Sequence, residues 1–79
     1  MKELVETIAK ALVDHPDDVY VTVRDEEQLI TLELTVNGQD MGKVIGKQGR
    51  VAKAVRSVVN AAAAQQNKRV RLDIIDPVG

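Results

Sequence analysis

Apolar residues recur along this chain with two different periods, one typical of helices and one typical of strands. Between residues 2 and 14 they return every three or four positions with charged residues between them, which predicts an amphipathic helix. Pro16 would end that helix, because proline lacks the N–H that a further turn needs. Residues 19–24 and 29–36 then alternate apolar and polar positions on either side of the charged segment 25–28. This alternation predicts two strands that each bury one face and form a hairpin.

The second half of the chain is expected to begin with two helices separated by a glycine-containing loop. Asn37 and Gly38 break the second strand, and Asp40 can cap a short helix over residues 41–45. After the loop, residues 50–66 show the clearest helical period of the sequence. We therefore expect a short helix followed by a long one.

The long helix carries more apolar residues than burial against one layer needs. Its stripe facing the core is expected to consist of Val51, Ala54, Val55, Val58 and Ala62. A further set widens the apolar arc to roughly twice the ~100° that a helix buried on one side needs, namely Ala52, Val59 and Ala63. This excess suggests a protein contact, so we expect a homodimer built partly on this helix.

Residues 69–75 alternate again and predict a third strand. The order helix, strand, strand, short helix, helix, strand gives an α+β fold with a three-stranded mixed sheet covered by helices on one face. Strand 29–36 reaches strand 69–75 through a helical crossover, which favours parallel pairing, whereas the hairpin pairing is antiparallel. One domain is expected over residues 1–79, with a core of about 2–75 and a frayed tail at 76–79.

The composition removes several classes of protein and of site. The 79 residues include no cysteine, so a disulfide framework, a thiolate metal site and a cysteine nucleophile are excluded, and a reducing cytoplasm is the expected location. No uncharged apolar run approaches the ~20 residues of a membrane span. Ser57 and His15 are the only residues of their kinds, and the spacing of the acidic residues matches no metal-binding loop. We therefore expect no enzyme, no metal and no cofactor.

Charge is distributed unevenly, although the whole chain carries a net charge of only −1. Residues 1–40 hold three basic and ten acidic residues, a net −7, whereas residues 41–79 hold eight basic and two acidic residues, a net +6. Such asymmetry indicates a polyanionic partner. The alternative is that the two halves neutralise each other by pairing.

The chemistry of a polyanion site is concentrated in the loop Gly46-Lys47-Gln48-Gly49, between the two helices. Two glycines three residues apart allow backbone angles that a Cβ forbids and let another backbone come close. The loop also precedes the N-terminus of the long helix, whose free N–H groups attract phosphate. Lys47 and Arg50 add cationic donors at the same place. These features indicate contact with a phosphodiester backbone, and a tight turn without a ligand is the structural alternative.

A KH domain of the bacterial type (type II) is what this chain resembles, in its element order and in the string Val44-Ile45-Gly46-Lys47-Gln48-Gly49-Arg50. In such domains a GxxG loop clamps single-stranded nucleic acid. With no further domain expected, the chain is similar to the small single-KH bacterial RNA-binding proteins of the KhpA type. The resemblance implies an RNA chaperone or post-transcriptional regulator that forms a homodimer. It also implies pairing with a larger KH-containing protein of the KhpB type, also called Jag or EloR.

RNA contact is expected in and around the loop, with phosphates over the glycines and bases on an aliphatic floor. The expected RNA-binding residues are Val44, Ile45, Gly46, Lys47, Gln48, Gly49, Arg50, Val51 and Lys53. Tyr20 is the only aromatic residue, which counts against folds that stack bases on exposed aromatic rings. A dimerising protein-interaction module and a single-stranded DNA binder remain the alternatives. Because the loop should be exposed, we expect the double variant Gly46→Asp/Gly49→Asp to stay folded.

Overall fold

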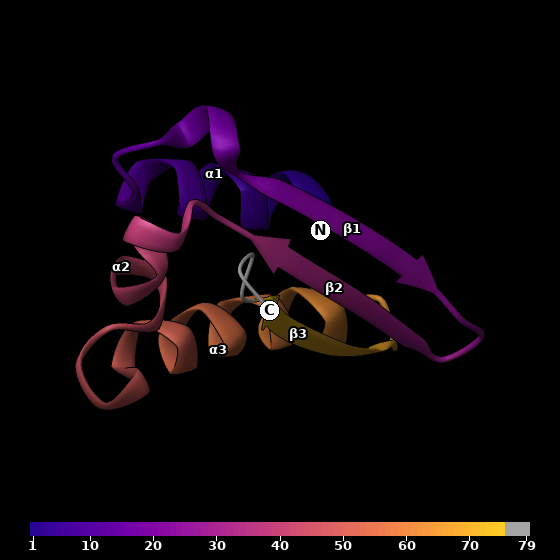
Figure 1. Ribbon diagram of the computed structural model, residues 1–79. Coiled ribbons are helices and arrows are strands. Elements are labelled where there is room, and N and C mark those ends of the chain that lie inside the picture. Colours follow the sequence, from indigo (N-terminus) through magenta and orange to yellow (C-terminus); the bar gives the residue numbers. More distant parts are fainter. Residues whose placement is uncertain (76–79) are drawn as a thin grey trace.

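A layer of helices packs on one face of a three-stranded sheet (Figure 1). The computed structural model describes residues 1–75. Its helices are α1 (Lys2–Leu12), α2 (Met41–Ile45) and α3 (Arg50–Ala64), and its strands are β1 (Tyr20–Asp25), β2 (Leu29–Thr35) and β3 (Arg69–Ile75). The expected α-β-β-α-α-β order is confirmed, and no expected boundary is wrong by more than two residues. The tail predicted for residues 76–79 lies outside the described residues.

The sheet is mixed, as expected, with strand order β1-β2-β3. β1 pairs with β2 antiparallel, and β2 pairs with β3 in parallel. Alternate residues of the central strand are buried against the helices, namely Ile30, Leu32 and Leu34. On β1 the expected buried face is wrong at Val23, which is 40% exposed. The reason is its position toward the hairpin end, where the two strands extend past α1 (Figure 1).

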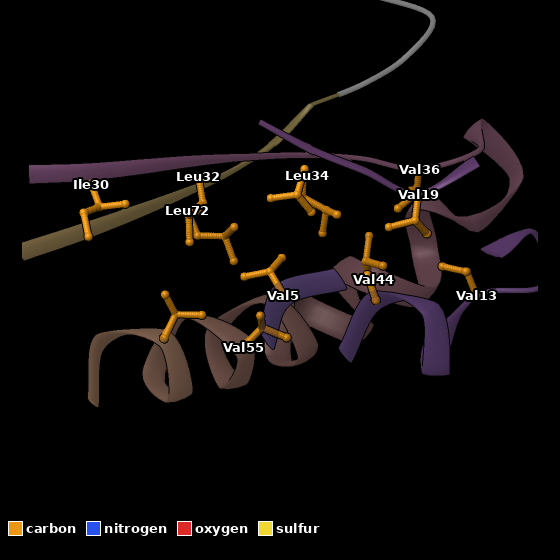
Figure 2. Packing of buried hydrophobic residues seen from close by; sticks show 13 residues of the cluster. Val5, Val13, Val19, Ile30, Leu32, Leu34, Val36, Val44, Val55 and Leu72 are labelled. Carbon is orange, nitrogen blue, oxygen red and sulfur yellow. The ribbon is translucent and has the colours of Figure 1, made fainter. Parts of the chain in front are cut away.

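Aliphatic side chains from both layers meet in one core (Figure 2). The largest fully buried apolar side chains are Leu32, Val5, Val36, Val44 and Val59. Each side chain of this size stabilises the fold by about 1.5–3 kcal/mol when it is buried. Because they come from α1, α2, α3, β2 and the residue after β2, this core fixes the position of the short α2 as well as that of the longer helices.

The face that α3 turns toward the sheet differs from the expected one. Its buried residues are Ala52, Val55, Val59 and Ala63, all 8% exposed or less. Of the predicted core stripe, Val55 is buried and Val51 is partly buried and packs against the core, whereas Ala54 and Val58 are exposed and Ala62 is only partly buried. The residues taken as surplus supply the rest of the core contact. Both stripes are apolar, so the sequence pattern alone did not decide between them, and the packing of α3 against β3 accompanies burial of the stripe that contains Val59.

The other apolar stripe of α3 remains exposed and faces α1. Val58 is 48% exposed, and Leu12 at the end of α1 is 38% exposed. Together they border a shallow groove of about 360 Å³. We call it the α1/α3 groove, and its lining residues are Ile8, Leu12, Arg50, Val51, Ala54, Val55 and Val58.

Candidate nucleic-acid interface

The loop from Gly46 to Gly49 is a single tight turn that joins α2 to α3. The N–H of Gly46 donates to the carbonyl of Gly42 at 2.8 Å and closes α2, and the N–H of Gly49 donates to the carbonyl of Gly46 at 3.2 Å. Three residues of the loop have positive φ, at +75° for Gly46, +58° for Gln48 and +74° for Gly49. Glycine adopts such angles without the steric cost of a Cβ, so the two glycines shape the turn.

The two glycines face different surroundings. A Cβ on Gly46 would run into the Val51 side chain and would lie 2.8 Å from the Val51 backbone nitrogen. A Cβ on Gly49 would meet no atom within 4 Å. Gly46 therefore packs the loop onto the first turn of α3, whereas Gly49 leaves the outer surface of the loop bare. The argument from exposure behind the variant Gly46→Asp/Gly49→Asp therefore applies at Gly49, whereas any side chain at Gly46 displaces Val51.

Three cations near the loop have no acidic partner in the part of the chain that the structure describes. Lys47, Arg50 and Lys53 are exposed, and among residues 1–75 none of them has a carboxylate partner. Other basic residues of the second half do form ion pairs, in the pairs Lys43–Asp14, Lys68–Asp25 and Arg71–Asp73. The alternative that the two halves of the chain pair with each other thus applies to Lys43 and Lys68, and the excess charge remains at the start of α3.

The N-terminus of α3 points its free N–H groups toward the same region. Gly49 stands at the N-cap position and has no side chain, and no side chain caps this helix. The first N–H groups of a helix have no partner within the helix and attract anions. The loop, the bare helix end and the cations Lys47 and Arg50 therefore form one surface suited to a phosphate.

Of the expected aliphatic floor, the structure exposes only part. Val44 is 2% exposed and belongs to the core, where it anchors α2. Ile45 is 36% exposed beside the loop, and Val51 is half-buried beneath it. Ile45 is thus the residue of this group that offers most apolar surface to a ligand.

A cleft between α3 and β3 lies beyond the residues singled out from the sequence. Its volume is about 340 Å³, and its lining residues are Arg56, Val59, Asn60, Val70, Arg71, Leu72 and Asp73. β3 is an edge strand, so alternate backbone N–H and C=O groups along it have no strand partner. Arg56 Nε donates to one of these carbonyls, that of Leu72, at 3.2 Å. The signal that could have indicated this cleft is the i, i+4 pair of polar residues Arg56 and Asn60 on a helix that precedes an edge strand.

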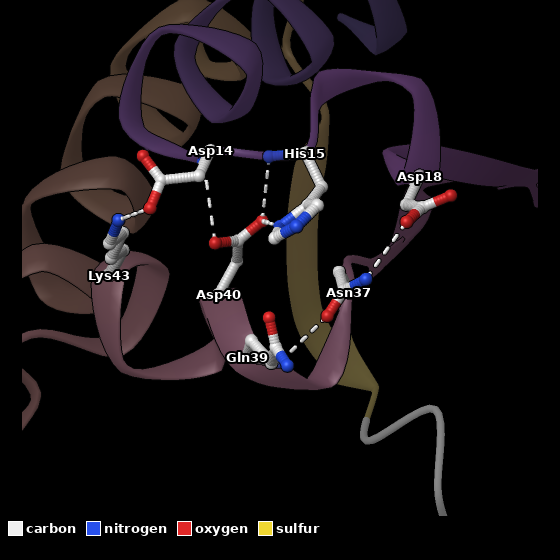
Figure 3. Close-up of polar contacts among 7 residues, drawn as sticks. All are labelled: Asp14, His15, Asp18, Asn37, Gln39, Asp40 and Lys43. Carbon is white, nitrogen blue, oxygen red and sulfur yellow. Dashed lines mark hydrogen bonds and ion pairs between the residues drawn. The ribbon is translucent and has the colours of Figure 1, made fainter.

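Asp40 is the one buried charged residue in the described chain and lies at the start of α2. Its carboxylate does not cap α2, so the expected cap is wrong. It turns instead toward the segment after α1, where it accepts hydrogen bonds from the N–H of Asp14 at 3.3 Å and the N–H of His15 at 3.0 Å (Figure 3). His15 Nδ1 lies 3.0 Å from the same carboxylate. The partners are about 25 residues away in sequence, which is why a local capping rule misses them.

Burial raises the pKa of Asp40, but the hydrogen bond from the His15 side chain, those from the N–H groups of Asp14 and His15, and the charge of His15 together outweigh it. The net effect holds the pKa of this carboxyl below its ordinary range. Asp40 is therefore a fixed negative charge near neutral pH, with all of its donors on one segment of chain.

Residues 1–75 also bear on two other kinds of site. No helix in this range is long and apolar enough to cross a membrane. No group of three potential metal-ligating side chains gathers in the same part of the chain.

A mixed three-stranded sheet with a short and a long helix joined by a Gly-x-x-Gly turn defines a KH domain. The chain belongs to the family described as KhpA/KhpB, KH domain, whose model matches residues 2–74. The chain is 67% identical over 76 residues to a protein of Halalkalibacterium halodurans named RNA-binding protein KhpA, with 96% of this chain and all of that protein covered. A protein of the same name from Clostridium acetobutylicum is 63% identical over 75 residues, which cover 95% of this chain and all of that protein. The resemblance inferred from the sequence is thereby confirmed.

Proposed function

We propose that this chain is an RNA-binding protein that grips single-stranded RNA with the loop Gly46–Gly49. The observation that carries the proposal is the combination of a bare loop surface at Gly49 with cations at Lys47 and Arg50 that have no acidic partner within residues 1–75. Membership of the KH family and the name of its relatives support RNA as the ligand.

In this proposal the RNA backbone crosses the loop and the bases follow the side of α3 that faces β3. Phosphates lie at the N-terminus of α3, where Lys47, Arg50 and Lys53 neutralise them. One base contacts Ile45, and the next bases enter the cleft beside Arg56, where the free edge of β3 offers backbone donors and acceptors. So few phosphate contacts predict modest affinity that falls as salt rises.

The decisive experiment compares two variants that add the same charge at opposite ends of α3. Gly49→Asp places a carboxylate where phosphate should lie, and Gln65→Glu places one about 24 Å away along the helix. With a fluorescein-labelled 12-nucleotide RNA, anisotropy titration should show about a tenfold or greater loss for Gly49→Asp and wild-type affinity for Gln65→Glu. Equal affinities of Gly49→Asp and wild type would show that the loop is not the clamp.

Two finer points of this function need further measurements. The loop surface would grip a DNA backbone as well, so we test the matching single-stranded DNA; a preference for RNA requires contact with the 2′-OH. We further propose a role as an RNA chaperone or post-transcriptional regulator, without catalysis or cofactor, as a single KH domain over residues 1–79 in the cytoplasm. An assay of annealing between two complementary RNA strands tests the chaperone role, since a chaperone accelerates it.

The α1/α3 groove favours an additional protein contact, and we propose a second copy of this chain as its occupant. The groove is almost wholly apolar and shared by two helices, so a two-fold interface can pair it with itself. Two linked clamps would also raise the affinity of a weak single site. Val58→Asp should convert a dimer to a monomer in sedimentation experiments, because it adds a charge to the apolar lining of the groove. A KH domain of a KhpB-type protein is the other occupant that the family suggests, and co-purification with that protein tests it.

A further inference from the structure

The position of the RNA clamp depends on α2, a helix that is too short to be stable without contacts to the rest of the chain. α2 has five residues, and isolated helices much shorter than about 12 residues are marginal in water. Its last residue, Ile45, leads directly into Gly46. Any shift of α2 therefore passes to the loop, and the contacts that fix α2 also fix the clamp. One such contact is the burial of Val44 in the core.

A second set of contacts, which are polar, fixes the N-terminal end of α2. We call it the α1/α2 network, and its members are Asp14, His15, Asp18, Asn37, Asp40 and Lys43 (Figure 3). It joins the chain that follows α1 to the chain that begins α2. Asn37 Nδ2 donates to Asp18 Oδ2 at 2.9 Å, and Lys43 forms an ion pair with Asp14.

Asp40 is the centre of this network and differs from its other members in burial. It is 1% exposed, whereas His15, Asp14 and Lys43 keep 42%, 70% and 43% of their side chains exposed. A buried carboxylate without its donors is strongly unfavourable, so its oxygens must stay where the donors are. All three donors come from Asp14 and His15. Asp40 thus sets where the first turn of α2 lies relative to the end of α1.

We infer that Asp40 and His15 are positioning residues of the RNA clamp, which hold α2 at the place and angle that present the loop to RNA. This inference rests on the proposed function. The charged groups that face the pair are Asp14 on the same segment as His15 and Lys43 on α2, and they are paired with each other. Removing a donor from Asp40 should therefore displace α2 and the loop without removing any residue that contacts RNA.

The test uses two variants of the network and one control in the sheet. His15→Ala deletes one donor but keeps both backbone donors, so the chain should stay folded. In the wild type, the Asp40 carboxylate faces three donors, and Asp40→Asn replaces this carboxylate by an amide. Ile30→Ala lowers stability from a buried site on β2, outside the network. Affinity for the labelled 12-nucleotide RNA is measured where each variant is folded, together with the amide signals of Gly46 and Gly49 in a ¹H–¹⁵N correlation spectrum.

We expect affinity to fall about fivefold in His15→Ala and about tenfold in Asp40→Asn, as is usual for coupling between sites. The Gly46 and Gly49 signals should shift in both variants, whereas Ile30→Ala should lower the thermal midpoint with unchanged affinity and unchanged glycine signals. Wild-type affinity and unshifted glycine signals in His15→Ala and Asp40→Asn would overturn the inference, leaving the network a purely stabilising role. If the wild-type chain bound no RNA, the proposed function would fail first, and the positioning role with it.

Discussion

Replacing each loop glycine by alanine should separate the two roles that the structure gives them. Gly49 has φ +74° and ψ 15°, a left-handed conformation that costs an alanine about 1–2 kcal/mol. Alanine also lowers the conformational entropy of the unfolded chain, which stabilises the folded state by about 0.4–1 kcal/mol. Because the space around a new Cβ is open, Gly49→Ala should lower the free energy of unfolding by only about 1 kcal/mol.

Gly46→Ala should be much more destabilising. Its φ of +75° and ψ of 174° lie in a region that is essentially restricted to glycine, with a cost of about 1–3 kcal/mol for other residues. The new Cβ would also lie 2.8 Å from the backbone nitrogen of Val51, so α3 itself must shift. Overpacking of this kind adds about 1–3 kcal/mol. The two terms together give a loss of about 3 kcal/mol or more.

Urea denaturation followed by far-ultraviolet circular dichroism measures both losses. For a chain of this size, 1 kcal/mol corresponds to a change of about 4–8 °C in the thermal midpoint, so the two variants should differ by roughly 10 °C. Val51→Ala in the Gly46→Ala background should rescue only part of the loss, because the backbone nitrogen remains in place. Equal stability of Gly46→Ala and Gly49→Ala would refute the reasoning, and full rescue by Val51→Ala would show that the side chain alone is responsible.

Three further outcomes are expected. Val59→Ala should cost about 2–3 kcal/mol because Val59 is 0% exposed, whereas Val58→Ala should cost well under 1 kcal/mol; equal losses in urea denaturation would contradict the face assigned to α3. Asn67 has φ +56° after α3, so Asn67→Gly should raise stability by about 0.5 kcal/mol in the same assay, and a loss would show that its side chain matters. The pKa of Asp40 is lowered in the folded chain. The stability that its ionised carboxylate contributes is therefore complete above about pH 4 and is lost as pH falls through the pKa of the folded state. Thermal midpoints at pH 6 and pH 3 should therefore differ more for wild type than for Asp40→Asn, and identical differences would exclude this origin.

Much of the fold could be predicted from the sequence because its elements depend on local pattern. Apolar and polar residues alternate strictly from Ile30 to Thr35, so only one face of that strand can be buried. The glycine loop was likewise predictable, since two glycines three residues apart permit the positive φ angles that Gly46 and Gly49 adopt. These features need no information about distant partners.

The features that the sequence did not predict depend on contacts between distant segments of the chain. α3 is apolar on two sides, and only the packing of Val59 against the sheet decides which side is inside. Asp40 precedes a helix and so matches a cap, but its donors lie on the chain after α1. The cleft beside Arg56 exists because β3 is an edge strand, a property of strand order rather than of residue type.

The face of the sheet opposite the helices is suited to site-specific labelling of the molecule. Thr22 is exposed on β1, and its neighbour Val21 points to the core, so Thr22 points away from α3 with its loop, cleft and groove. The chain has no cysteine, so Thr22→Cys would be the only thiol in the molecule. A fluorophore or a surface tether attached there would report on single molecules with the proposed RNA and partner surfaces left accessible.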